Sequence, residues 1–283
     1  MPLSFALPSP LEYFAALVQS DDDFALFEAA VCLGQDEYPS LDVQSVLGDV
    51  DLLLARIKQC LAADAGPVQK IRMLNHFFFH DLNFGGNANN FYDPDNSFIH
   101  ALLRSRRGIP ISLAVLWMEL AQGLGLSVRG VGFPGHFMIK VQLPMGQAVI
   151  DPLSGKSLSR EQLAERLEPF RWRNGLLDEF EVPLGLYLQP ATSREIIARM
   201  LRNLKEIFTA QMDWERLLAV QERLVILLPD FWPEYRDRGL AHAELGHADE
   251  ALSDLAYYLD HAEDLVDVEV ITDRLDSLRR LQG

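Results

Sequence analysis

The sequence predicts an α+β fold in two parts: a mostly helical domain that holds a small antiparallel sheet, followed by an all-α module of helical repeats. Three observations support this prediction. Apolar residues recur every three or four positions over most of the chain, which is the helical period. Residues 127–151 instead form short extended runs separated by turn residues. From about residue 198, two similar helical stretches follow one another.

The boundary between the two parts falls near residues 181–192, where the sequence is rich in Pro and Gly and lacks a helical period. We therefore expect a first domain of residues 1–190 and a repeat module of residues 191–283. The T-x-x-E spacing of Thr192 and Glu195 is typical of a capping box, so a new helix should begin there.

Helices make up most of the first domain. Residues 10–63 have room for three of them, and a fourth should run from about Pro67 into the aromatic run of residues 76–80. Turn formers and a polar loop follow, up to about residue 98. A buried central helix is then expected over residues 111–123. Its apolar side chains keep helical spacing: Leu113, Leu116, Trp117, Leu120 and Ala121.

Three extended runs after this helix predict the small sheet: residues 127–133, 136–143 and 147–151, with a turn at residues 144–146. His136 begins the second run and Asp151 ends the third. Because an antiparallel hairpin brings these two ends together, we expect both side chains at the same end of the sheet.

The C-terminal module has the sequence pattern of tetratricopeptide repeats. One unit of 34 residues starts at Trp232, and its aromatic, glycine, turn and small positions are occupied by Tyr235, Gly239, Gly246 and Ala251. The preceding unit is divergent, because Lys205 replaces the first glycine. A last helix covers residues 271–282. About three repeats are needed to bury a continuous core, so we expect an appended module that binds a protein partner.

The charge of the chain excludes several classes of partner. Its 25 Lys and Arg residues stand against 41 Asp and Glu, a formal net charge of −16, which phosphate backbones and anionic membranes repel. We therefore expect neither a nucleic acid nor a membrane partner.

The first twenty residues lack a basic leader, and no segment is apolar enough to span a bilayer, which predicts a cytoplasmic location. Cys32 and Cys60 lie in apolar helical surroundings without CxxC spacing, so buried free thiols are expected.

A resemblance to a known family rests on six stretches: NFYDPDNSF, RRGIPISLAVL, GVGFPGHF, IDP, RMLRNLKEIF and YRDRGL. They are similar to the transglutaminase-like proteins of the papain-like superfamily, in the bacterial SirB-type branch that carries C-terminal tetratricopeptide repeats. The resemblance implies the transglutaminase-like fold and a site in which a nucleophile at a helix start faces a histidine and an aspartate. His136 and Asp151 match that histidine and aspartate, but Pro110 occupies the position of the catalytic cysteine.

Two hypotheses about function follow. The first is a non-catalytic interaction or regulatory protein. It rests on Pro110, because proline has no nucleophilic side chain and its fixed φ suits the first turn of a helix. The alternative is a divergent hydrolase or acyl-transfer enzyme. In that case Ser112, or a water activated by His136 and Asp151, would attack the substrate.

A cluster of arginines directly before the central helix is the other polar feature: Arg104, Arg106 and Arg107. Ion pairs with Asp93 and Asp95 would pin the polar loop over the helix start. The alternative is an anion or carboxylate site, because arginine forks bind such groups. His76 and His80 have the spacing of zinc ligands but lack the glutamate of H-E-x-x-H, so we expect core or rim residues there, and neither a metal nor a cofactor.

Overall fold

The computed structural model of this chain describes residues 8–20, 24–90, 92–173, 183–261 and 267–282. Its contacts divide the chain into two compact units. The sheet unit consists of Asp22–Gly34 and Ser40–Met200. The repeat unit consists of Met1–Asp21, Gln35–Pro39 and Leu201–Gly283. This division differs from the predicted one at residues 190–191, because the N-terminal helix packs with the repeats and the first repeat helix is shared between the units. Residues 181 and 182 of the predicted boundary lie outside the described part.

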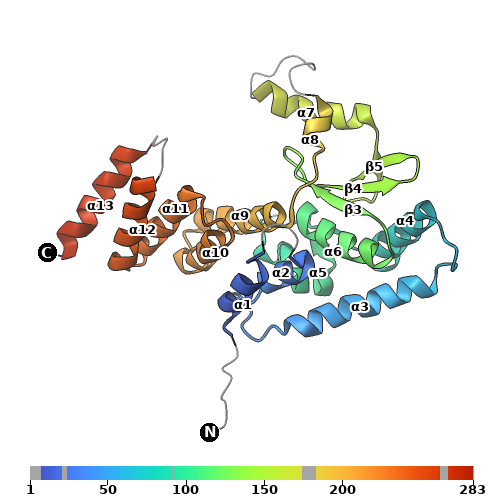
Figure 1. The fold of residues 1–283 in the computed structure, drawn as a ribbon. Helices are drawn as coiled ribbons and strands as arrows, with labels where there is room; N and C mark the ends of the chain where they lie inside the picture. The colour runs from blue at the N-terminus through green and yellow to red at the C-terminus, as the bar shows by residue number, and fades with distance from the viewer. Residues whose placement is uncertain (1–7, 21–23, 91, 174–182, 262–266, 283) are drawn as a thin grey trace, which may run out of the picture. The chain divides into compact units, whose positions relative to one another are not determined.

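The sheet unit is mainly helical, as the sequence predicts (Figure 1). Its longer helices are α2 (Leu26–Cys32), α3 (Val43–Gln59), α4 (Pro67–Asn75), α5 (Ile99–Ser105), α6 (Pro110–Gly123) and α7 (Arg160–Arg173). Short turns complete it: the π-helix η1 (His76–Asp81), the 3-10 helix η2 (Pro94–Asn96) and α8 (Leu184–Tyr187). The predicted helix from Pro67 through the aromatic run is thus α4 continued by η1. Cys32 is buried as expected, but Cys60 is exposed, because it lies at the C-terminal cap of α3.

Four antiparallel strands form the sheet, in the order β3-β4-β5-β6. They are β3 (Val128–Val131), β4 (Met138–Leu143), β5 (Gly146–Ile150) and β6 (Ser157–Leu158). The first three confirm the predicted runs, and β6 was not predicted because two residues are too short for a period. A second pair, β1 (Gly85–Gly86) and β2 (Arg107–Gly108), is parallel and was also missed.

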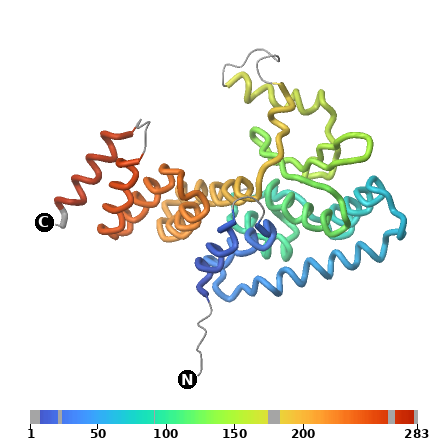
Figure 2. Tube along the Cα trace, viewed as in Figure 1, coloured from blue at the N-terminus to red at the C-terminus, as the bar shows by residue number. Residues whose placement is uncertain are grey.

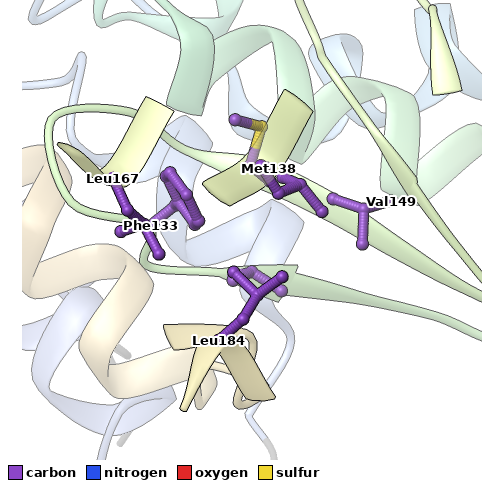
Figure 3. Packing of buried hydrophobic residues seen from close by; sticks show 7 residues of the cluster. Phe133, Met138, Val149, Leu167 and Leu184 are labelled. Atoms are coloured by element: carbon purple, nitrogen blue, oxygen red, sulfur yellow. The ribbon is translucent and has the colours of Figure 1, made fainter. Parts of the chain in front are cut away.

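A hydrophobic cluster supports the loop between β3 and β4. Figure 3 shows Phe133 and Met138 from the two ends of this loop, together with Val149 of β5, Leu167 of α7 and Leu184 of α8. Phe133 is 1% exposed and Met138 is fully buried. Since 133 and 138 flank residue 136, the packing of this cluster restricts where His136 can lie.

Paired helices make up the repeat unit (Figure 2). It contains α1 (Pro10–Leu17), the second half of α9 (Ser193–Gln211), α10 (Trp214–Leu227), α11 (Trp232–Glu244), α12 (Ala248–His261) and α13 (Val268–Gln282). A side chain at Gly239 would place its Cβ 2.9 Å from Leu255 Cγ, so only glycine lets α11 and α12 approach this closely. Gly246 has a φ of +78° in the turn between them.

The predicted capping box is confirmed at the start of α9. The Glu195 amide donates to Thr192 Oγ1 at 3.2 Å, and the Thr192 amide donates to Glu195 Oε2 at 2.8 Å. Two of the backbone donors at this helix start are therefore satisfied by side chains.

Candidate functional site

The side chains at the start of α6 pack and bond against the backbone. Pro110 is the first helical residue, where its missing N–H costs nothing. Ser112 is fully buried. Its Oγ lies 2.6 Å from the carbonyl oxygen of Asn96 and 3.1 Å from that of Ile109, and it accepts the Ile109 amide at 3.1 Å. The hydroxyl predicted as a possible nucleophile is thus used to join the helix start to the preceding loop.

His136 and Asp151 lie together, as the hairpin geometry predicts. His136 Nε2 is 3.1 Å from Asp151 Oδ1, and the two side chains are only 16% and 9% exposed. His136 itself lies in the turn before β4, and Asp151 directly follows β5. The register that pairs Ile139 with Ile150 carries both residues to the same end of the sheet. Within the part of the chain that the structure describes, Nδ1 of His136 has no hydrogen-bond partner.

Asp151 is held in its ionised form. Burial would raise the pKa of this carboxyl, but the hydrogen bonds from His136 and from the Leu153 amide, with the charges of His136 and Arg166, outweigh burial and lower the pKa to about 2. An ionised Asp151 accepts the hydrogen of Nε2, so the imidazole turns its other nitrogen away from the carboxylate. In its neutral form, a ring oriented in this way can accept a proton at Nδ1.

Two arginines belong to this site, and the sequence reasoning missed both. Arg166 on α7 places a guanidinium nitrogen 3.1 Å from Asp151 Oδ2. Arg199 on α9 donates to the backbone oxygens of His136 at 3.1 Å and of Phe133 at 3.4 Å, and so anchors the loop that carries the histidine. No local motif marks either residue, because each reaches the site from a different helix. Arg199 does lie inside the family stretch RMLRNLKEIF, which was the available signal.

The predicted arginine cluster engages several different partners. Arg104 lies 3.9 Å from Asp95, and both side chains are exposed. In the described residues this is the only ion pair between the cluster and the loop. Arg107 donates to the carbonyl oxygens of Asn83 and Arg106. Arg106 covers the ring of Phe84, with its Cζ 4.7 Å from the ring centroid.

The loop aspartates have local roles. Asp93 accepts hydrogen bonds from the Asp95 amide and from the Asn90 side chain, both at 3.1 Å, so it shapes the polar loop from within.

The histidine pair of η1 lies close together. His76 and His80 are 5.3 Å apart between ring centroids, and His76 lies 3.4 Å from Asp81. Among the described residues, no group of three or more His, Cys, Asp and Glu side chains is arranged to hold a metal ion. No described helix combines the length and the apolar character that membrane crossing requires.

Comparison with known proteins agrees with this architecture. The model of the transglutaminase-like superfamily matches residues 44–202, and that of the tetratricopeptide repeat matches residues 204–276. These matches define a transglutaminase-like protein with a C-terminal tetratricopeptide-repeat module, which confirms the predicted domain architecture.

Individual relatives place the chain more closely. A UPF0162 protein of Xylella fastidiosa (strain Temecula1) is 35% identical over 244 residues, which cover 84% of each chain. The UPF0162 protein BU173 of Buchnera aphidicola is 26% identical over 268 residues, 92% of this chain and 96% of the relative. The chain belongs to the UPF0162 family of transglutaminase-like proteins. Among solved structures, menin is similar with a TM-score of 0.43 and 12% identity over 90% of this chain and 70% of its own, too distant for the sites to be compared.

Proposed function

We propose that this protein is a non-catalytic interaction protein in which the transglutaminase-like fold serves as a scaffold and the repeat unit binds a protein partner. The observation that carries the proposal is the start of α6. Pro110 offers no nucleophile, and the Ser112 hydroxyl is buried among backbone atoms. A cysteine or serine nucleophile needs a free side chain at this position to reach a substrate carbonyl. The proposal includes a cytoplasmic location, a reducing compartment in which cysteine thiols such as Cys32 and Cys60 stay reduced.

The repeat unit supports the second part of the proposal, because several of its buried charges pair within the unit and leave its apolar surface side chains available. Glu234 is 2% exposed and pairs with Lys205 at 2.6 Å and with Arg202 at 3.0 Å. Arg238 forms two hydrogen bonds of 2.7 Å with Asp254. Four large apolar side chains of the unit are also exposed and could contact a partner: Met212, Phe231, Tyr257 and Val270.

One observation favours a second candidate, a hydrolase that uses an activated water. His136 is oriented by an ionised Asp151, and its Nδ1 has no partner among the described residues. This nitrogen has the geometry to take a proton from a water molecule that attacks a carbonyl. We place it second because the described residues beside His136 offer no nucleophilic side chain, so the site would depend on general-base catalysis alone.

Hydrolysis of a panel of activated esters and amides separates the two candidates. We expect wild type, His136→Ala and Ser112→Ala to be indistinguishable from buffer. His80→Ala, an exposed histidine of η1, is the matched control. Turnover that His136→Ala loses and His80→Ala keeps, with both variants folded, would establish the hydrolase instead. The Ser112→Ala rate would then tell serine attack from activated water.

Cross-linking in living cells tests the repeat unit. We expect specific cross-linked partners of the full-length chain to be lost in Phe231→Glu and Val270→Glu, since a charge in an apolar contact must be desolvated. Leu52→Glu, an equally exposed apolar residue on α3 of the sheet unit, is the control and should retain them. Partners retained by all three variants would contradict the assignment to the repeats.

A further inference from the structure

Strand β3 is an edge strand, and part of its edge is open. In the β3–β4 pairing, the Gln142 amide bonds to the Ser127 oxygen at 2.9 Å. Hydrogen-bonded pairs alternate along an antiparallel ladder, so Arg129 and Val131 also bond toward β4. The N–H and C=O groups of Val128 and Gly130 consequently point to the other side, away from the sheet. Figure 1 shows β3 at the margin of the sheet.

Only one of these outward groups is satisfied by the described residues. The Ala191 amide donates to the Gly130 oxygen at 2.9 Å. The Gly130 N–H and both backbone groups of Val128 have no partner in the described chain, although Val128 is only 3% exposed. Buried backbone groups are almost always paired, so three unpaired groups in a row on an edge strand indicate a place for another strand.

A cavity of about 940 Å³ lies along this edge, within the sheet unit. Its wall includes Val128 and Gly130 together with apolar side chains from α2 and α6 and from the N-terminal end of α9. Phe27, Met118 and Ile196 are three of these. A volume of this size accommodates several residues of an extended chain. The wall is mixed, so its apolar side chains can contact one set of alternating residues of a strand and its polar groups the other set.

The cavity also contains a carboxylate that lacks a counter-charge. Glu119 of α6 lines it and has neither an ion pair nor a hydrogen bond with any described residue. Burial and then the nearby charge of Asp51 raise the pKa of Glu119. Glu28, the other acid of the wall, accepts a hydrogen bond from Gln44. Arg129 also lines the rim, but it is exposed, and strand alternation turns its side chain to the opposite face from Val128.

We propose that this cavity binds an extended peptide segment of a partner protein, which adds to β3 as a further strand and places a lysine or arginine against Glu119. The backbone groups of Val128 and Gly130 would supply the main-chain hydrogen bonds, and Glu119 the preference for a basic residue. The site lies in the sheet unit, so it is separate from the partner surface proposed for the repeats and goes beyond that function.

Amide hydrogen exchange of the full chain by NMR tests the main-chain contacts. The probe is the blocked heptapeptide Thr-Val-Thr-Lys-Thr-Val-Thr. We expect it to slow exchange of the Val128 and Gly130 amides at least tenfold. The amides of Arg129 and Val131 already bond to β4, so their exchange serves as the internal control and should change much less. A peptide that leaves Val128 and Gly130 unprotected at millimolar concentration overturns the proposal.

Affinity measurements test the role of Glu119. A dye-labelled copy of the peptide should bind Glu119→Gln at least fivefold more weakly than wild type, and a version with Glu in place of Lys should also bind wild type more weakly. The glutamine keeps the shape of the side chain and removes a charge that burial disfavours, so the variant should fold. Glu168→Gln, an exposed acid of α7, is the control. Equal affinities for Glu119→Gln and wild type would overturn the proposal.

The hydrogen-exchange experiment has one further outcome. Protection of the Val128 amide that grows with protein concentration in the absence of peptide would assign the edge to a second copy of the chain, and would overturn the proposal as well.

Discussion

At the scale of single residues, Asp151 is the most constrained side chain of the site. It accepts hydrogen bonds from His136 and Arg166, each at 3.1 Å, and from the Leu153 amide at 3.0 Å. All of these favour the ionised form, and together they overcome the cost of burial. The hydrogen bond from His136 to Asp151 therefore stabilises the folded chain, independently of any catalytic role.

This arrangement predicts a pH-dependent contribution to stability. The pKa of Asp151 in the folded chain is about 2, below the ordinary value of 3.8, so its contribution is fully present above about pH 4 and is lost as the pH falls through 2. We expect the difference in unfolding free energy between wild type and Asp151→Asn to shrink by about 2 kcal/mol between pH 5 and pH 2, in urea titrations. Asp64→Asn, at an exposed loop position, is the control. A difference that stays constant with pH would contradict the assignment.

The sequence predicted the His136–Asp151 contact, because hairpin geometry alone brings the two together. It did not predict that Arg166 would join them, since nothing local relates a helix surface to the end of a strand. Ser112 is the opposite case, because the sequence suggested a role for it that its contacts in the fold do not favour. Its position at a helix start suits a nucleophile. Only the fold shows that its hydroxyl donates a hydrogen bond to the Asn96 carbonyl oxygen.

At the scale of elements, the turn that follows Asp151 is fitted closely against α4 and η1. Gly155 has a φ of +67°, and a Cβ there would collide with the ring of Phe79 at Cε2. Its carbonyl accepts the Asn75 side-chain amide at 2.9 Å, and the Asn75 oxygen in turn accepts the Trp117 indole N–H at 2.9 Å. Asn75 thus links the end of α4, the central helix α6 and the turn after Asp151.

Two glycines separate the effect of this contact from that of backbone strain. Gly135 has a φ of +69° with nothing within 4 Å of its added Cβ, whereas Gly155 combines almost the same φ with the contact to Phe79. We expect Gly135→Ala to cost about 1 kcal/mol of unfolding free energy from the left-handed conformation alone. Gly155→Ala should cost about 2 kcal/mol more, because the ring of Phe79 or Asn75 must move. Equal losses in chemical denaturation would show that the turn adapts freely.

At the scale of the whole molecule, the repeat unit recruits segments from the opposite end of the sequence. Arg223 of α10 is 1% exposed at its side chain and forms two hydrogen bonds with Asp36, at 2.5 and 2.8 Å. Its guanidinium also lies 4.8 Å from the ring centroid of Phe14 in α1. A pair of repeats is too short to close its own core, and α1 with residues 35–39 covers α10 within this unit.

This pair predicts an asymmetric response to substitution. Asp36→Ala leaves a buried guanidinium without its counter-charge, so we expect a loss of about 3 kcal/mol in the unfolding free energy of the repeat unit. Arg223→Met removes the charge and keeps the length of the side chain, and should cost less. Glu37→Ala breaks the neighbouring pair with the half-exposed Arg216 and should cost at most about 1 kcal/mol. A larger loss in Glu37→Ala than in Asp36→Ala would contradict the role given to Asp36.

Local pattern was sufficient for the helices, the β3–β5 meander, the capping box at Thr192 and the tetratricopeptide period, because each depends on contacts within a few residues or on a repeat length. It was also sufficient to set the histidine beside the aspartate. The tertiary structure alone decided the rest: Arg166 and Arg199 at the site, the pairing of β1 with β2, the share of α1 in the repeat unit, and the open edge of β3 above Glu119. Each of these joins segments that are distant in sequence, and the free energy of such contacts depends on burial and packing that no local spacing encodes.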